Sequence, residues 1–275
     1  DAAARAVGQL GAELGLDELE AASGIVRLAN AEMVRALRVV TVNRGIDPRE
    51  FALLPFGGAG PMHAAELAAE MGMSRLICPR AGGVLSALGL LASARRRDTA
   101  KTVMIEPGGL TQAAVAAAVG ELRENLADGM DVHTETISYE LRYQGQAFGL
   151  PVEAGPDASP AELTRRFAEA HERHYGFEVP DAPVELVAIR LALAGKPPEL
   201  EPRAAEGEVE DSSRRVRFGG EWHEASVATG EPAAGAAFTG PAVLELPEST
   251  LVLPPGWRAE VDGHGSVLAA LEEGP

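Results

Sequence analysis

The chain has 275 residues, of which 46% are hydrophobic, and its 24 Lys and Arg against 41 Asp and Glu residues give a formal net charge of −17 at pH 7. This length predicts more than one domain. The acidic balance argues against sequence-independent nucleic-acid binding, which depends on basic side chains that neutralise phosphates. The most apolar run, residues 81–94, is shorter than the roughly 20 residues of a membrane-spanning helix, so no membrane anchor is predicted.

The one cysteine, Cys78, excludes an internal disulfide framework and fits a reducing cytoplasm. It lies in the apolar run RLICP, where we expect a small buried side chain and not a catalytic thiol. The chain starts at Asp1 with helical composition and without a visible signal peptide. These features predict a cytoplasmic protein and one part of a longer polypeptide.

Helices open the chain. Residues 2–19 have a helical composition, and apolar side chains recur every three to four positions over 23–44, which predicts a helix with Ser23 as its N-cap. The run FALLPF at 51–56 is short, apolar and followed by glycines. Such a run is typical of a strand buried on both faces of a parallel sheet.

Glycines then connect strands to helices. GGAG at 57–60 leads into a predicted helix over 61–71, SRLICP at 74–79 predicts a second buried strand, and glycines at the start of 81–93 lead into another helix. The repeated order of strand, glycine turn and helix indicates an α/β domain. Its end is expected near residue 100.

Residues 101–195 predict an α+β domain. A helix is expected over 111–128, and residues 137–143 alternate apolar with polar side chains, as in a half-exposed strand. The other expected elements are a hairpin partner within 146–153, a helix that begins at Ser159 and Pro160 with a capping box to Glu162, and a strand over 184–195.

The last part of the chain predicts a linker and a small all-β unit. Residues 196–215 are rich in Pro, Glu and Ser and lack apolar periodicity, and the rest has short runs of β-forming residues separated by Gly and Pro. The expected domains are therefore 1–100, 101–195 and 196–275.

The glycines before the helix at 61–71 suggest an anion site. Gly57, Gly58 and Gly60 allow close approach of the backbone to a ligand, and the N–H groups at the helix start lack intrahelical acceptors, which suits a phosphate. His63 is expected to add a donor as a neutral imidazole, because the helix dipole disfavours its positive charge. A tight strand-to-helix turn also explains the glycines, and the motif is not a Walker A loop. The residues alone leave both interpretations open.

One long segment resembles the hydantoinase A/5-oxoprolinase family. It is ANAEMVRALRVVTVNRGIDPREFALLPFGGAGPMHAAELAAEMGMSRLICPRAGGVLSALGLLAS, and the order of its pieces matches over residues 23–97. The later runs YELRYQGQAFGLPV, FAEAHERHYGF and GPAVLELPESTLVLPPGWRAEVD resemble the C-terminal region of that family. The resemblance therefore covers most of the chain.

This resemblance implies the C-terminal part of an ATP-dependent N-methylhydantoinase A-type subunit. The implied fold is α/β, part of an actin/sugar-kinase-like nucleotide domain, followed by an α+β unit and a small all-β C-terminal unit. The implied activity is hydrolysis of a small cyclic amide with ATP and Mg²⁺. The implied partners are the upstream part of the A-type subunit and a hydantoinase B-like subunit.

The resemblance also assigns candidate site residues. The positions that match the family's second glycine-rich nucleotide motif, with an implied contact to adenosine or the α-phosphate, are Gly57, Gly58, Ala59, Gly60, Pro61 and His63. Gly82, Gly83 and Ser86 match the next turn and are expected to support it. The Asp-Gly-Gly-Thr-like and acidic glycine-rich loops, which would hold the β/γ-phosphates and Mg²⁺, do not occur here. This segment alone is therefore expected to be inactive, with ATP and Mg²⁺ bound mostly by residues outside it.

Two alternatives remain at this stage. Relatives in the family are subunits of acetone and acetophenone carboxylases, so the segment is alternatively part of such a carboxylase, or a non-catalytic module that docks a hydantoinase B-like partner. His171 and His174 lie three positions apart on a predicted helix. With no third ligand in view, we expect a surface or interface helix there and no metal site.

Overall fold

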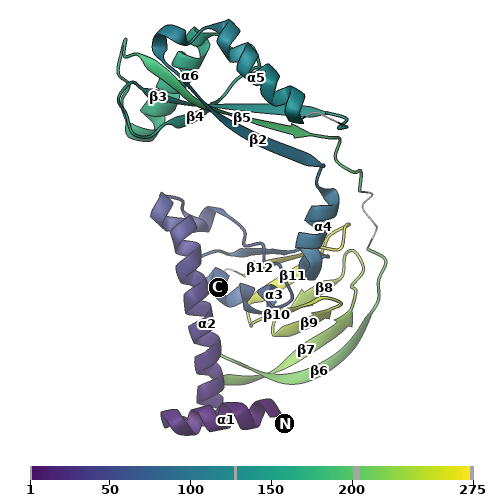
Figure 1. The fold of residues 1–275 in the computed structure, drawn as a ribbon. Coiled ribbons are helices and arrows are strands. Elements are labelled where there is room, and N and C mark those ends of the chain that lie inside the picture. Colours follow the sequence, from purple (N-terminus) through teal and green to yellow (C-terminus); the bar gives the residue numbers. More distant parts are fainter. Residues whose placement is uncertain (1, 127–128, 201–204, 273–275) are drawn as a thin grey trace. The chain divides into compact units, whose positions relative to one another are not determined.

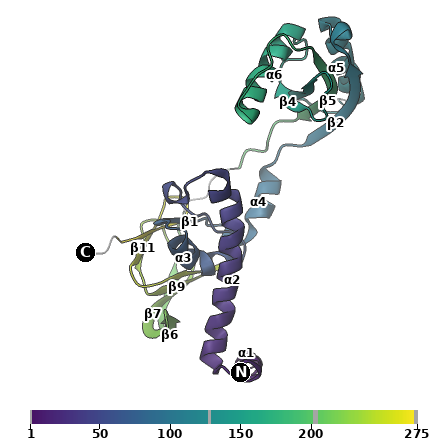
Figure 2. The same cartoon turned by 90° about the vertical axis from the view of Figure 1, so that its left-hand side faces the viewer.

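The computed structural model describes residues 2–126, 129–200 and 205–272, and the chain divides into two compact units. Unit 1 comprises Asp1–Leu90 and Glu201–Pro275, and unit 2 comprises Leu91–Leu200. The colours of Figures 1 and 2 follow the sequence, so unit 2 is teal to green, while unit 1 combines purple and blue elements with light green and yellow ones. Unit 2 is one continuous stretch, whereas unit 1 needs both ends of the sequence.

The helices of unit 1 come first in the chain. They are α1 (Ala2–Leu14), α2 (Glu18–Val40), α3 (Gly60–Glu70) and α4 (Leu85–Ala92, whose last two residues belong to unit 2), with short 3₁₀ turns at Val42–Arg44, Pro48–Glu50 and Gly82–Val84. Asp17 caps α2: its carboxylate accepts from Glu20 N at 2.8 Å, and the Glu20 carboxylate accepts from Asp17 N at 3.0 Å. This reciprocal capping box starts the helix earlier than predicted. Ser23 therefore lies inside α2 and is not its cap.

Two four-stranded sheets complete unit 1. Their strands are β1 (Arg75–Cys78), β6 (Val209–Phe218), β7 (Glu221–Gly230), β8 (Ala237–Thr239), β9 (Ala242–Leu246), β10 (Ser249–Leu253), β11 (Trp257–Val261) and β12 (Val267–Leu271). One sheet has the order β1-β12-β11-β8 and the other β10-β9-β7-β6. Each strand pairs antiparallel with its neighbours except for the parallel pair of β7 and β9.

The predicted parallel sheet in the first 100 residues is wrong. Residues 51–56 form no strand, although Leu53 makes a single parallel bridge to Leu76. The expected strand at 74–79 exists as β1, but β12 pairs with it antiparallel. The run at 51–56 is also not buried on both faces, because Phe51, Leu54 and Phe56 are exposed. An apolar run therefore shows neither that a segment is a buried strand nor which strand supplies its hydrogen bonds.

The structure also differs from the expected third domain over 196–275. A single core of unit 1 joins α2, α3 and β1 to strands β9 to β12, and its fully buried members include Leu76, Leu251 and Leu253. Part of the expected linker, residues 209–215, lies in β6, while residues 201–204 lie outside the described part of the chain. The polar composition of β6 arises because it is an edge strand with mostly exposed side chains.

Unit 2 is a two-layer α+β arrangement. Its elements are β2 (Arg96–Ile105), a 3₁₀ turn at Pro107–Gly109, α5 (Gln112–Leu126), β3 (Thr134–Tyr143), β4 (Leu150–Glu153), α6 (Pro160–Tyr175) and β5 (Val184–Ala194). The sheet is antiparallel with the order β2-β5-β3-β4, and α5 and α6 cover one of its faces (Figure 1). The predicted helix over 111–128 is found as α5, and residues 127–128 lie outside the described residues.

The core of unit 2 follows the alternation that the sequence predicts. Ile137, Tyr139 and Leu141 on β3 are buried beneath side chains of both helices, among them Phe167 of α6. Tyr139 donates its hydroxyl to the Gly155 carbonyl oxygen at 2.6 Å, and burial raises its pKa to about 12. The buried Tyr139 hydroxyl thus has a hydrogen-bond acceptor within unit 2 in place of water.

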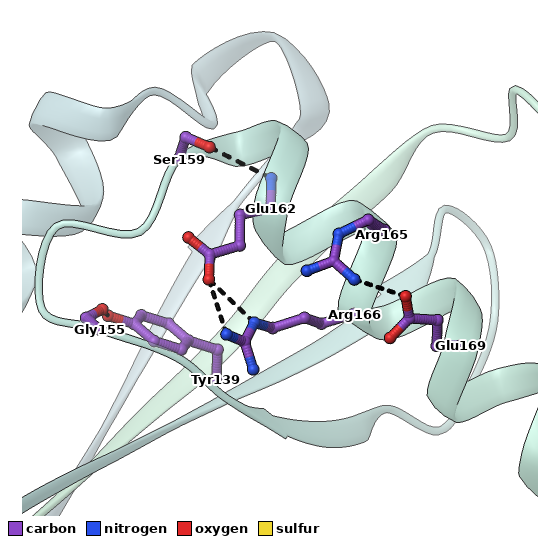
Figure 3. A network of polar contacts seen from close by, with 7 residues as sticks. All are labelled: Tyr139, Gly155, Ser159, Glu162, Arg165, Arg166 and Glu169. Carbon is purple, nitrogen blue, oxygen red and sulfur yellow. Dashed lines mark hydrogen bonds and ion pairs between the residues drawn. The ribbon is translucent and has the colours of Figure 1, made fainter.

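Helix α6 starts where the sequence predicts, with Ser159 as its cap (Figure 3). The Ser159 hydroxyl oxygen accepts from the Glu162 N–H at 3.2 Å. The Glu162 carboxylate pairs with Arg166 at 2.9 Å, one turn later on the helix. The predicted capping box is therefore formed on the Ser159 side, while an ion pair occupies the Glu162 carboxylate.

No helix within residues 2–126, 129–200 and 205–272 is both long and apolar enough to cross a membrane.

Candidate functional site

The predicted anion site lies where the loop after residue 56 enters α3. Gly57 has a φ of +83°, a conformation that side chains other than glycine rarely adopt, and its N–H donates to the Gly82 carbonyl oxygen at 2.7 Å. The two glycine-rich turns of the sequence therefore lie side by side. One predicted ligand donor, the Gly57 N–H, is already used for this contact.

The second glycine turn packs against the hairpin between β9 and β10. A Cβ added at Gly83 would lie 2.2 Å from the backbone oxygen of Glu248, so only glycine fits there. A Cβ added at Gly58 would lie 3.6 Å from the same oxygen, an ordinary contact. Gly82 and Gly83 thus have the contacts of supporting structure, while Gly58 is exposed. Ser86 is exposed on α4.

The start of α3 carries free backbone donors. Ala59 is the N-cap residue and supplies no side-chain cap, and Pro61 has no N–H. Among the residues that the structure describes, the N–H groups of Gly58, Ala59 and Gly60 have no hydrogen-bond partner. Gly58 and Ala59 are exposed. Free donors at a helix N-terminus are the groups that bind a phosphate, so this turn fits an anionic ligand.

His63 belongs to a polar cluster between two helices. Its Nδ1 lies 2.8 Å from the Asn30 Oδ1, and the Asn30 Nδ2 donates to the Glu66 carboxylate. Asn30 is on α2 and is only 5% exposed, whereas His63 and Glu66 lie three residues apart on α3. Neither Asn30, the partner of His63, nor Glu66, the partner of Asn30, was found from the sequence. The available signal was a polar residue, Asn30, one helical turn before the buried Val34 on the same face of α2.

The helix with His171 and His174, α6, lies at the surface with one buried face, and His171 is on that face whereas His174 is exposed. His171 is 1% exposed, its Nδ1 lies 2.8 Å from the Phe177 carbonyl oxygen, and its ring packs edge-on against Tyr143 and Phe167. The expected surface or interface position is therefore wrong for His171, because an aromatic cluster buries the ring. No group of three or more His, Cys, Asp or Glu in the described ranges is placed to hold a metal ion.

Cys78 is a buried residue of β1. Its side chain is 0% exposed, and burial raises the pKa of its thiol to about 11. The thiolate is the reactive form of cysteine, and it is disfavoured here at neutral pH. The expectation of a small buried side chain is confirmed.

The fold defines a class of protein, a mixed α/β chain with several sheets, and in the described residues the start of α3 has N–H groups without a hydrogen-bond partner. The chain matches the hydantoinase/oxoprolinase family model over residues 1–99 and the hydantoinase/oxoprolinase C-terminal domain over residues 109–268. It belongs to the hydantoinase/oxoprolinase family. The resemblance that the sequence motifs indicate is thus confirmed.

Similar proteins are much longer than this chain. An uncharacterized protein of Methanocaldococcus jannaschii is 36% identical over 273 residues, which are 96% of this chain and 40% of that protein. The caprolactamase subunit alpha of Pseudomonas jessenii is 33% identical over 90% of this chain and 39% of its own length. The 5-oxoprolinase 1 of Arabidopsis thaliana is 30% identical over 92% of this chain and 21% of its own length.

Solved structures share the fold. The ATP-dependent caprolactamase from Pseudomonas jessenii superposes with a TM-score of 0.67 and 29% identity, over 96% of this chain and 42% of that one. A nucleotide-free acetone carboxylase has a TM-score of 0.77 over 98% of this chain and 42% of that one, at 24% identity. The chain thus has the mixed α/β architecture of carboxylase and caprolactamase subunits.

Proposed function

We propose that this chain is part of an ATP-dependent enzyme that hydrolyses a cyclic amide, of the hydantoinase A/5-oxoprolinase type. Family membership and the relatives named caprolactamase and 5-oxoprolinase support this function. The single observation that carries it is the start of α3, where the N–H groups of Gly58, Ala59 and Gly60 have no hydrogen-bond partner among the described residues. The N–H groups and the positive end of the helix dipole both favour a phosphate.

In this proposal the turn forms one wall of a nucleotide cleft, within an actin/sugar-kinase-like ATPase domain. Gly58, Ala59 and Gly60 donate to the α-phosphate, and Gly57, Pro61 and His63 shape the wall beside it. ATP supplies the phosphoryl group that activates the amide. Mg²⁺ and the β/γ-phosphates belong to residues outside this segment, since phosphoryl transfer requires a donor and metal cradle. The segment by itself is accordingly proposed to be inactive.

We further propose that the chain works in a multi-subunit enzyme with a hydantoinase B-like partner. Relatives that support this are named as subunits, among them the caprolactamase subunit alpha and the acetone carboxylase beta subunit. The upstream part of the A-type subunit would complete the nucleotide cleft.

A second candidate is a segment of an ATP-dependent ketone carboxylase. The observation in its favour is the 26% identity over 286 residues to the acetone carboxylase beta subunit of Xanthobacter autotrophicus. In that case phosphoryl transfer would go to the enol of a ketone, and carboxylation would replace amide hydrolysis.

The test joins this chain to an upstream A-type segment, adds a B-like subunit and measures ATP hydrolysis. We expect stimulation by caprolactam or 5-oxoproline. Stimulation by acetone that depends on bicarbonate would favour the carboxylase. Intact assembly without stimulation by any of these compounds would overturn both activities and favour a docking module.

A single substitution tests the turn itself. We expect Gly60→Val to weaken nucleotide binding by the assembled enzyme about tenfold or more, because a branched side chain covers N–H groups that form charge-assisted hydrogen bonds. The fold should tolerate it, since a Cβ at Gly60 would lie 3.8 Å from Pro55. Gly120→Val, on α5 with no atom within 4 Å of its Cβ position, is the matched control. Unchanged affinity of Gly60→Val would remove the phosphate assignment.

A further inference from the structure

Three side chains form a continuous chain of hydrogen bonds from Glu66 through Asn30 to His63. Asn30 is buried in α2, while Glu66 is exposed and His63 is half-buried on α3. Asn30 contacts the His63 Nδ1 through its amide oxygen at 2.8 Å and the Glu66 carboxylate through its amide nitrogen. The cluster lies at the first turns of α3, the helix whose start carries the free N–H groups.

The chemistry of these groups determines where the protons lie. An ionised carboxylate only accepts hydrogen bonds, so the NH₂ of Asn30 must face Glu66. The Asn30 oxygen then faces His63, and because that oxygen only accepts, the His63 Nδ1 must carry a hydrogen. A neutral His63 therefore has its lone pair on Nε2. In the described ranges, Nε2 has no hydrogen-bond partner.

We propose that Asn30 is a positioning residue that holds His63 in the Nδ1–H tautomer, so that Nε2 accepts a hydrogen bond from a hydroxyl group of the bound ligand. The identification of that hydroxyl as a ribose hydroxyl of a nucleotide rests on the proposed function. The turn then has two kinds of group: N–H donors for anionic oxygens at Gly58 to Gly60, and one acceptor for a hydroxyl at His63. The sequence had suggested a donor at His63, whereas the contact with Asn30 leaves an acceptor.

The positive end of the α3 dipole supports this assignment. A second proton on Nε2 would place a cation at the helix N-terminus, which the dipole disfavours. Asn30 itself remains neutral at every pH, so it orients the ring without adding charge. Glu66 in turn prevents the amide of Asn30 from rotating, because rotation would set its oxygen against the carboxylate.

The first test reads the tautomer directly. Long-range ¹H–¹⁵N NMR of this chain, above the pH range in which free histidine titrates, should find His63 in the Nδ1–H form. His171 should show the same form, because its Nδ1 lies 2.8 Å from the Phe177 carbonyl oxygen, and it serves as an internal control. In Asn30→Ala, His63 should shift toward the Nε2–H form that predominates in free histidine, while His171 should not change.

A second variant tests the same proposal in case Asn30→Ala does not fold. Glu66→Gln alters an exposed position and allows the Asn30 amide to rotate, so it should also mix the tautomers of His63. An Nε2–H form of His63 in the unmodified chain would overturn the proposal. An unchanged Nδ1–H form in both variants would overturn it as well.

The functional test uses the assembled enzyme and deoxy-ATP analogues. His63→Asn keeps an amide near the position of Nδ1 and lacks Nε2. We expect the unmodified enzyme to bind ATP about five- to tenfold more tightly than 2′-deoxy- or 3′-deoxy-ATP, the size of one neutral hydrogen bond. His63→Asn should abolish this discrimination, and Asn30→Ala should reduce it.

The outcomes separate the two proposals. Retained discrimination in His63→Asn would overturn the role of Nε2, while nucleotide binding would still support the proposed function. Failure of the unmodified enzyme to bind any nucleotide would overturn the proposed function and the ribose contact together, and the NMR result would still decide the positioning role of Asn30.

Discussion

Unit 1 and unit 2 solve the same packing problem with different parts of the sequence. In unit 2, residues 91–200 supply the sheet, the helices and every side chain of the core. In unit 1, β1 pairs with β12 from the far end of the sequence, and α3 packs into a core with Leu251 and Leu253. Local sequence patterns predict the fold of a unit made from one continuous segment, whereas they do not predict the fold of a unit assembled from distant segments.

Two histidines show the same contrast at the level of single groups. His171 in unit 2 has its Nδ1 against the Phe177 carbonyl oxygen and its Nε2 3.4 Å from the Gln146 side-chain nitrogen, and it is buried. His63 in unit 1 uses its Nδ1 for Asn30 and has no described partner for Nε2. A ring with both nitrogens engaged stabilises the fold. A ring with one nitrogen open is available to a ligand.

The largest expected effect is the loss of folding in a fragment. Residues 91–200 alone should fold, because their core and hydrogen bonds are internal. Residues 1–90 alone should not fold, because their core lacks the strands β9 to β12. The dispersion of ¹H–¹⁵N NMR signals shows whether each of the two fragments is folded. Cooperative unfolding of the 1–90 fragment would contradict the division, and addition of the 201–275 fragment in trans is the control for recovery.

A core truncation should destabilise unit 2 more than any surface change. Phe167 is 1% exposed and packs edge-on against Tyr143. We expect Phe167→Ala to lower the free energy of unfolding by about 3–5 kcal/mol, because it removes buried apolar surface and leaves a cavity. Phe148→Ala, at an 81% exposed position of the same unit, should change it by less than about 0.5 kcal/mol. Denaturant unfolding measures both, and equal effects would disprove the predicted core.

The packing of the glycine turns in unit 1 predicts a smaller effect. We expect Gly83→Ala to cost about 1–3 kcal/mol, because its Cβ would lie 2.2 Å from a backbone oxygen that cannot rotate away. Gly58→Ala is the matched control, with 3.6 Å to the same oxygen, and should leave the melting temperature nearly unchanged. A stable Gly83→Ala variant would show that this turn is not closely packed on Glu248.

Alkaline pH should destabilise unit 1 before unit 2. Burial raises the pKa of Cys78 in unit 1 from 9.0 to about 11 and that of Tyr139 in unit 2 from 10.0 to about 12. Each folded unit keeps a proton that the unfolded chain loses, so stability declines as pH rises through these two windows, each decline being roughly 2–3 kcal/mol.

The control for the alkaline prediction is removal of each titrating group. Cys78→Ala should flatten the decline of unit 1 between pH 9.0 and about 11, and Tyr139→Phe should flatten that of unit 2. Denaturant unfolding at several pH values measures the slopes. A stability that rises with pH in either window would contradict the assignment to burial.

Much of the local structure was predictable. The alternation at 137–143 marks β3, the pair Ser159 and Pro160 marks the start of α6, and the apolar run at 74–79 marks β1, because periodicity and capping act over neighbouring residues. The motif at 57–63 was also found as a candidate, from its glycines and its position before a helix. The predicted site did not include Asn30, because this residue is distant from the motif in sequence although it contacts His63 in the structure.

The amino-acid sequence by itself thus determined most of the helices, the strands β1, β3 and β5, and to which family the chain belongs, but not the absence of a strand at 51–56 or the presence of β6. Only the tertiary structure decided that β12 pairs with β1, that the Gly57 N–H donates to the Gly82 carbonyl oxygen, and that Asn30 contacts His63. The reason is physical: periodicity records that a group is buried, whereas its partner depends on which distant segment supplies the complementary hydrogen bond.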